Sequence, residues 1–354
     1  HWDLPQYIED KYGGWLNTSA MVQLFTEYAD TCFQQFGDRV KHWITFNEPW
    51  VTSVLAYGVG VNAPGRCTAC EAGNSATEPY IVAHTQLLAH AHTVQLYRTR
   101  YQPYQRGTIG ITLNSDFLAP YSPSEEDVAA AQRQQEFSLG WFADPVFFGD
   151  YPQSMKDRVG KRLPSFTAEE KILLKGSSDF LGINHYTSQY VTMNPKPKPN
   201  TDYYNDIGTI SGIENYKGEV IGPPSEAVWL RVVPWGIRSL MNWIRKRYDN
   251  PIVYITENGV PVPKEDDIPL KDAIEDDFRL NYLNDYLTQL SLAIKEDKCN
   301  VKAYFVWSLL DNFEWADGYS VRFGVHYVDY KDPNLTRYAK KSSKWYAQLI
   351  QPYK

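Results

Sequence analysis

The chain of 354 residues lacks any apolar run long enough to cross a membrane, so we expect no transmembrane segment and no membrane partner. It also lacks a basic excess, because 35 Lys and Arg face 42 Asp and Glu and the net charge is -7. Without a Lys/Arg-rich run, this balance argues against a nucleic-acid partner. No histidine or cysteine set has the spacing of a metal site, so we expect no metal and no cofactor.

Four cysteines are too few for a disulfide scaffold. Cys67 and Cys70 lie between glycine-containing turns and therefore in a loop. Either a small loop-closing disulfide or two free thiols fits this placement. The sequence contains two glycosylation sequons, Asn17-Thr18-Ser19 and Asn334-Leu335-Thr336. Together with the loop cysteines, they favour the secretory pathway and an extracellular or vacuolar destination.

Aromatic residues are abundant, with 11 Trp and 26 Tyr, which is more than a core needs. Their flat faces and polar edges suit sugar rings, which carry apolar C–H faces and hydroxyl rims. A Trp-rich core is the alternative explanation, and composition alone does not choose between the two.

Two short strings place single carboxylates where a strand pattern gives way to a turn. Glu48 follows the strand pattern that ends at Phe46, and Glu257 ends the pattern that begins at Ile252. Taken alone, either Glu is more often a solvated turn residue. Together, at the C-terminal ends of two strands, they suggest the acid/base and nucleophile pair of a glycosidase.

Strand and helix patterns alternate along the chain, which predicts a parallel α/β architecture. We expect strands near residues 40–46, 108–113, 179–186, 252–256 and 302–308. Helices are expected at 21–36, 78–101, from 125, from 168, and at 234–248, 271–297 and 338–349. A long Pro/Asn/Gly/Tyr-rich loop is expected over 187–227. No break in composition marks a second domain, so residues 1–354 are expected to form one catalytic domain.

Seven motifs, in order and nearly from end to end, resemble glycoside hydrolase family 1, the β-glucosidase family, and are most similar to its plant members. They are His1-Trp2-Asp3-Leu4-Pro5-Gln6, Phe36-Gly37-Asp38-Arg39-Val40, Asn47-Glu48-Pro49, Ala63-Pro64-Gly65-Arg66-Cys67, Asp179-Phe180-Leu181-Gly182-Ile183-Asn184, Thr256-Glu257-Asn258-Gly259 and Trp307-Ser308-Leu309-Leu310-Asp311-Asn312-Phe313-Glu314-Trp315. Plant members also carry a cysteine pair in the loop of Cys67 and Cys70, usually at wider spacing.

The resemblance implies a TIM (β/α)8 barrel and a retaining β-glycosidase acting on O-glycosidic bonds of β-D-glucosides or oligosaccharides. It assigns Glu48 as the general acid/base and Glu257 as the nucleophile. Retention predicts a carboxylate separation of about 5–5.5 Å, whereas roughly 9 Å would indicate inversion.

The resemblance also supplies a substrate-binding set around these carboxylates. Asn47 corresponds to the family's ligand for the sugar 2-hydroxyl, Tyr186 to a phenol that contacts the nucleophile, and Trp229 to an aglycone platform. The remaining members of the set are His1, Trp2, Asn184, Trp307, Glu314, Trp315 and Phe323.

The family fold needs eight barrel strands, and only about five are found in the sequence. His1-Trp2-Asp3 resembles the end of the third barrel strand. We therefore expect an N-terminally truncated, incomplete barrel with about strands 4–8. A catalytically impaired fragment or a non-catalytic carbohydrate-binding protein is the alternative function. Retention of both Glu48 and Glu257 weighs against it, and the sequence leaves the oligomeric state open.

Overall fold

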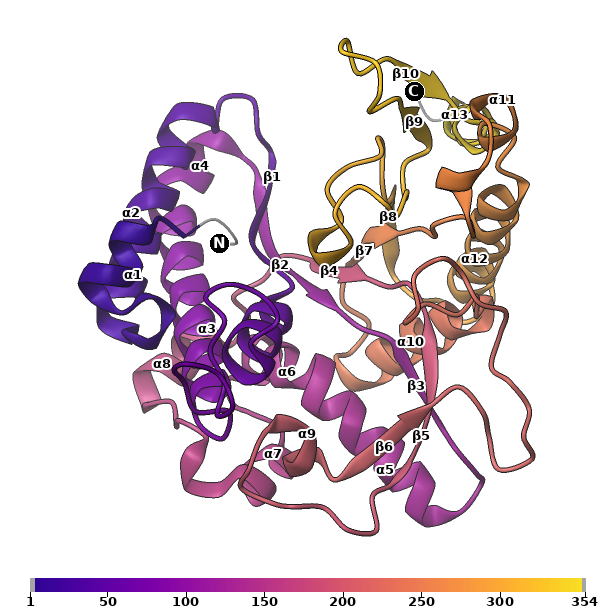
Figure 1. Cartoon of the computed structure of the whole chain (residues 1–354). Helices are drawn as coiled ribbons and strands as arrows, with labels where there is room; N and C mark the ends of the chain where they lie inside the picture. The colour runs from indigo at the N-terminus through magenta and orange to yellow at the C-terminus, as the bar shows by residue number, and fades with distance from the viewer. Residues whose placement is uncertain (1–3, 352–354) are drawn as a thin grey trace. The chain divides into compact units, whose positions relative to one another are not determined.

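The computed structural model describes residues 4–351 and divides into two compact units (Figure 1). The first comprises His1–Ile183 and Tyr190–Gly212, and the second comprises Asn184–Gln189 and Ile213–Lys354. Among the described residues, no helix is long and apolar enough to cross a membrane.

The central strands of the first unit are β1 (His42–Asn47), β2 (Thr108–Asn114) and β4 (Leu181–Asn184), which are neighbours in that order. Strands β1 and β2 are parallel, and their register shifts just before Asn47. Strand β2 is buried along most of its length, as expected for a strand covered on both faces. These strands confirm three of the five sequence predictions.

Helices α2 (Thr18–Phe36) and α3 (Glu78–Leu96) lie side by side in the first unit (Figure 1). The Asn17 side chain caps α2 by accepting from the Ala20 amide, and the buried residues of the helix are Met21, Phe25, Ala29 and Phe33. The other helices of this unit are α1 (Gln6–Tyr12), η1 (Gly14–Leu16), η2 (Val51–Val59), η3 (Tyr97–Tyr101), α4 (Gln102–Gln105), α5 (Glu125–Gln135), η4 (Glu136–Gly140), α6 (Trp141–Phe148), α7 (Gln153–Val159), η5 (Gly160–Arg162), α8 (Ala168–Leu174) and α9 (Tyr203–Ile207).

The expected loop over 187–227 was wrong in its first half. Strand β5 (Ser188–Met193) begins in the second unit and continues into the first, where it pairs antiparallel with β6 (Thr209–Gly212). Strand β3 (Phe117–Pro120) is its other neighbour, and α9 lies between β5 and β6 in the chain. The run Tyr-Val-Thr at the centre of β5 has strong strand propensity, which the surrounding Pro, Asn and Gly residues obscure.

The second unit contains the parallel strands β7 (Val253–Asn258) and β8 (Val301–Val306), with helices α10 (Pro234–Arg247) and α12 (Asp277–Lys295) packed together. These elements confirm the predictions for this region, except that residues 271–297 form two helices. The remaining elements are η6 (Glu265–Asp267), α11 (Leu270–Ala273), η7 (Trp315–Asp317), the antiparallel pair β9 (His326–Val328) and β10 (Arg337–Ala339), and α13 (Lys341–Ile350).

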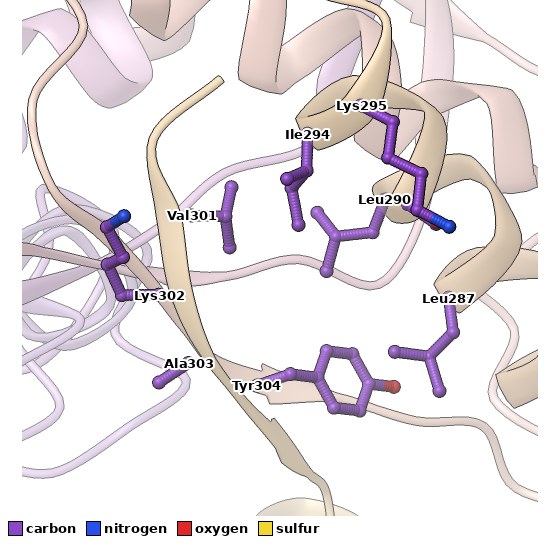
Figure 2. Close-up of a pocket in the computed structure, with 9 residues that line it drawn as sticks. Leu287, Leu290, Ile294, Lys295, Val301, Lys302, Ala303 and Tyr304 are labelled. Atoms are coloured by element: carbon purple, nitrogen blue, oxygen red, sulfur yellow. The ribbon is translucent and has the colours of Figure 1, made fainter. Parts of the chain in front are cut away.

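A hollow of about 430 Å3 lies between α12 and β8 (Figure 2). Leu287, Leu290 and Ile294 of α12 and Val301 of β8 give it a largely apolar lining. None of the predicted sugar-binding or catalytic residues lines it. The hollow is therefore a feature of packing at β8 and not part of the predicted site.

A cluster of buried charged side chains lies in the second unit. Its members are Glu265, Asp276, Arg279, Asp311, Arg322 and Lys340, and every side chain is at most 4% exposed. Arg279 donates to Glu265 and Asp276, whereas Arg322 and Lys340 both donate to Asp311. Removing one member would leave the remaining buried charges unbalanced, which is far more costly than losing a surface ion pair.

We expect Asp311→Ala to lower the free energy of unfolding by about 3–5 kcal/mol, because Arg322 and Lys340 lose a shared carboxylate inside the protein. Urea unfolding followed by tryptophan fluorescence measures this change. Asp38→Ala is the control, because Asp38 and Arg39 are both 70% exposed and such pairs contribute about 1 kcal/mol or less. Equal losses in the two variants would contradict a structural role for the cluster.

Candidate active site

Glu48 directly follows β1 in the first unit, next to Asn47 at the strand's last position. Its amide donates to the Thr112 carbonyl at 3.0 Å, and its own carbonyl accepts from the Val51 amide at 2.9 Å. Its φ of 54° is left-handed, a conformation that costs a non-glycine residue roughly 1–3 kcal/mol. The chain thus holds this half-buried carboxylate in an unfavourable backbone conformation at a strand end.

A buried histidine supports β1, the strand that ends directly before Glu48. His90 Nδ1 lies 2.7 Å from the Thr45 hydroxyl, and its Nε2 lies 3.1 Å from the Ser177 hydroxyl. Burial lowers the pKa of His90 to about 3, so the ring is neutral at physiological pH. Both ring nitrogens are engaged by hydroxyl groups, which makes His90 a structural support for β1.

Glu257 lies on β7 in the second unit, one residue before its end. The His185 amide donates to the Glu257 carbonyl at 3.0 Å, and the Tyr186 hydroxyl donates to Glu257 Oε2 at 2.6 Å. On the preceding residue, the Thr256 hydroxyl donates to Asn184 Oδ1 at 2.6 Å. The end of β4 and the segment after it therefore fix both the backbone and the carboxylate of Glu257.

Aromatic rings surround the Tyr186 phenol. Trp229 meets the Tyr186 ring edge-on at 5.7 Å between centroids, and Phe323 does so at 6.0 Å. Trp229 is 52% exposed, whereas Phe323 is buried. Through Tyr186, Trp229 lies close to the Glu257 carboxylate, and its role as the stacking residue stays a prediction.

Glu314 and Trp307 form a second polar pair in this unit. The indole Nε1 of Trp307 donates to Glu314 Oε1 at 3.3 Å, and the Glu314 amide donates to the Gly318 carbonyl at 2.7 Å. Burial raises the pKa of Glu314 to about 7, although hydrogen bonds from Trp307 and Asn312 act in the opposite direction. The carboxyl group therefore changes its charge near neutral pH.

The predicted site residues fall into three groups. Asn47 and Glu48 belong to the first unit, and the others described belong to the second, namely Asn184, Tyr186, Trp229, Glu257, Trp307, Glu314, Trp315 and Phe323. His1 and Trp2 lie outside the described residues. Because Glu48 and Glu257 belong to different units, the expected spacing of their carboxylates stays a prediction.

The choice that the sequence left open for the loop cysteines is decided by the structure. Cys67 and Cys70 form a disulfide with an S–S distance of 2.08 Å. Within residues 4–351, no group of three or more His, Cys, Asp or Glu side chains is placed to hold a metal ion.

Sequence reasoning missed a polar network behind Glu257. Asn258 donates through Nδ2 to the His185 carbonyl at 2.7 Å and to the Tyr282 hydroxyl at 2.9 Å. Tyr282 and Tyr286 are four residues apart on α12, and both donate to the Tyr186 carbonyl. Their i, i+4 spacing was the only signal in the sequence, and it is equally typical of core aromatics.

Comparison with known proteins agrees with the motifs. The model of glycosyl hydrolase family 1 matches residues 1–354. Rice (Oryza sativa subsp. japonica) beta-glucosidase 6 is 52% identical over 99% of this chain and 68% of its own length. A variant of a rice beta-glucosidase solved in a covalent complex with glucose is 52% identical, with a TM-score of 0.95 over 98% of this chain and 73% of that one.

A β-glucosidase from the fungus Humicola insolens in complex with glucose is 46% identical, with a TM-score of 0.96 over 99% of this chain and 74% of that one. The chain belongs to glycosyl hydrolase family 1 and has the α/β fold of that family's TIM-barrel enzymes. It is therefore a glycosyl hydrolase. These matches cover 98–99% of this chain and 68–74% of the relatives' own length, and they do not test the expectation of an N-terminally truncated, incomplete barrel.

We expect Gly259→Ala to destabilise the protein by about 3 kcal/mol, at the upper end of ordinary overpacking, because the new Cβ would lie 1.7 Å from the Trp307 carbonyl oxygen. Urea unfolding measures the loss. Gly212→Ala is the matched control, since nothing lies within 4 Å of its new Cβ and the change should stay within about 0.5 kcal/mol. A Gly259→Ala protein as stable as the control would show that Gly259 is not in this close contact with the Trp307 carbonyl.

Proposed function

We propose that this chain is a retaining β-glucosidase that hydrolyses the O-glycosidic bond of β-D-glucosides by double displacement. Glu48 acts as the general acid/base and Glu257 as the nucleophile. Two related structures support glucose as the sugar of the substrate, since one is a covalent complex with glucose and the other a complex with glucose. A covalent glycosyl–enzyme intermediate is the mark of retention.

The single observation that carries the proposal is the 2.6 Å hydrogen bond from the Tyr186 hydroxyl to Glu257 Oε2. A donor on a carboxylate oxygen favours the ionised form, which is the form that can attack an anomeric carbon. It also holds the carboxylate in one rotation.

The reaction proceeds in two steps. The Glu257 carboxylate attacks the anomeric carbon while Glu48 gives its proton to the glycosidic oxygen, so the C1–O bond breaks and the aglycone leaves as an alcohol. Glu48, now ionised, takes a proton from water, and the water oxygen displaces Glu257 from C1. Glucose leaves with its original anomeric configuration, and both carboxyl groups return to their starting states.

The proposed sugar-binding groups are those that the family motifs assign. Asn47 contacts the 2-hydroxyl and Trp229 stacks on the aglycone. Glu314 accepts hydrogen bonds from sugar hydroxyls, and its negative charge disfavours a sugar phosphate. The other proposed contacts are His1, Trp2, Asn184, Tyr186, Trp307, Trp315 and Phe323.

We also propose that both units belong to one catalytic domain. The family model supports this, because it matches residues 1–354 as one segment. In that domain β1, β2, β4, β7 and β8 would be the fourth to eighth barrel strands. The positions of Glu48 after the first of these strands and Glu257 in the fourth support the assignment.

We expect the chain to hydrolyse a chromogenic β-glucoside and Glu257→Gln to abolish turnover, because an amide is a poor nucleophile. Glu48→Gln should lower kcat by about 10²–10⁴-fold on a substrate with a poor leaving group, because proton transfer to that group is lost. Initial rates measure both changes, and NMR of the first-formed sugar reports the anomer.

Glu136→Gln is the matched control, because this carboxylate contacts Ser154 and is not among the proposed site residues. It should keep its turnover. Glucose released with inverted configuration, or turnover that survives in Glu257→Gln, would refute the assignment. Binding of a glucoside without turnover by the unaltered chain would favour a carbohydrate-binding protein.

We expect glucose to bind more weakly as the pH falls from 8 to 6, because protonation of Glu314, with a pKa of about 7, removes its ability to accept two hydrogen bonds. The ionised fraction of Glu314 falls about tenfold over this range, so the Kd of glucose should rise by at most about tenfold. Calorimetric titration with glucose measures it. Glu314→Gln should flatten the dependence and Glu296→Gln should not. A slope unchanged in Glu314→Gln would show that another group is responsible.

A further inference from the structure

We propose that Tyr282 and Tyr286 are positioning residues that hold the Tyr186 phenol on the Glu257 carboxylate. The inference rests on the proposed function, because it concerns how the nucleophile is kept oriented and ionised. Both act on the backbone of Tyr186, whose hydroxyl donates to the Glu257 carboxylate.

The two phenols converge on one carbonyl oxygen. Tyr282 donates to the Tyr186 carbonyl at 2.7 Å and Tyr286 donates to the same atom at 2.9 Å. Their rings stack 4.0 Å apart with planes 22° from parallel, and both side chains are buried. A carbonyl oxygen has two lone pairs, so these two donors can saturate it.

The direction of each hydrogen bond is fixed by its other partner. The Val233 amide can only donate, and it donates to the Tyr286 hydroxyl at 2.9 Å, so the proton of that hydroxyl remains for the Tyr186 carbonyl. In the same way, Asn258 Nδ2 donates to the Tyr282 hydroxyl at 2.9 Å. Each hydroxyl thus accepts a hydrogen bond from one of these groups and donates one to the Tyr186 carbonyl.

The chain of bonds extends to β8. The Tyr304 hydroxyl donates to Asn258 Oδ1 at 2.7 Å, which orients the amide so that its nitrogen faces Tyr282. Burial raises the pKa of Tyr282 and of Tyr304 well above the ordinary value, so both phenols remain protonated donors across the working pH range. The bonds from Tyr304 through Asn258 to Tyr282 therefore run in one direction, towards the Tyr186 carbonyl.

Tyr186 is consequently held between two elements. On one side, the His185 amide bonds the Glu257 carbonyl of β7, and on the other, α12 holds the Tyr186 carbonyl. With the backbone fixed at both places, the ring places its hydroxyl 2.6 Å from Glu257 Oε2. Releasing the carbonyl would let the peptide rotate and would weaken the bond that favours the ionised nucleophile.

The test uses Tyr282→Phe and Tyr286→Phe, which keep the ring stacking and remove one donor each. The primary measurement is the pKa of Glu257 by ¹³C NMR of protein labelled at glutamate carboxyl carbons, with Glu257→Gln to assign the signal. We expect each variant to raise this pKa by about half to one pH unit and the double variant to raise it further. The acidic limb of the kcat/KM profile should move by the same amount, and kcat/KM should fall about tenfold.

Tyr101→Phe is the matched control, because its hydroxyl also donates a hydrogen bond, to the Asp30 carboxylate, and belongs to none of the described bonds of this network. It should leave the Glu257 pKa unchanged. In a Tyr186→Phe background, Tyr282→Phe should have no further effect on that pKa, because the two changes act through the same hydroxyl.

Phe variants that lose thermal stability while the Glu257 pKa stays where it is would overturn the proposal and leave Tyr282 and Tyr286 as core residues. Additive shifts in the Tyr186→Phe background would overturn it as well. If a Phe variant does not fold, Tyr304→Phe, which removes the first donor of the chain, is measured in the same way. Turnover by the unaltered chain is a separate outcome, since its absence would refute the proposed function without affecting the NMR result.

Discussion

The backbone hydrogen bond from the His185 amide to the Glu257 carbonyl sets the arrangement on which the site of the second unit depends. Side chains on extended segments alternate between two sides, so a shift of one residue would turn Tyr186 away from Glu257. Asn258 reinforces the same register by donating to the His185 carbonyl. A catalytic carboxylate needs this kind of support, because a misplacement of about 1 Å is costly in rate. Register, and not the phenol alone, therefore determines the geometry at Glu257.

Buried charges hold together the segment that carries Glu314. The Asp311 carboxylate accepts from the amides of Gly324 and Val328 as well as from Arg322 and Lys340. Buried ion pairs contribute little net stability when they form, but they are very unfavourable when broken. They consequently penalise alternative loop conformations more than they stabilise the fold. This property suits a loop that must present Glu314 in one geometry, with its pKa raised by burial.

Local patterns in the sequence predicted much of this structure. The strand ends at Glu48 and Glu257 were predicted because strand propensity and turn residues are signals within a few positions. Strand β5 was missed because it is short and surrounded by Pro, Asn and Gly. The network behind Tyr186 could not be predicted from the sequence, for another reason. Its partners on α12 are 96 and 100 positions away, and a tyrosine that donates to a remote carbonyl has the same sequence pattern as one that fills a core.

Among the described residues, nine non-glycine residues have a positive φ, and two of them are residues that the family resemblance assigns to sugar chemistry. Glu48 and Trp315 have φ values of 54° and 48°, and Glu314 is buried enough to raise its pKa. A bulky residue in the left-handed region is uncommon, and it persists only where the surroundings force it. For Glu48 those surroundings include the hydrogen bond from its amide to the Thr112 carbonyl of β2. Strain and motif are independent observations, and their agreement at Glu48 argues that the backbone there is shaped by the position its carboxylate must occupy.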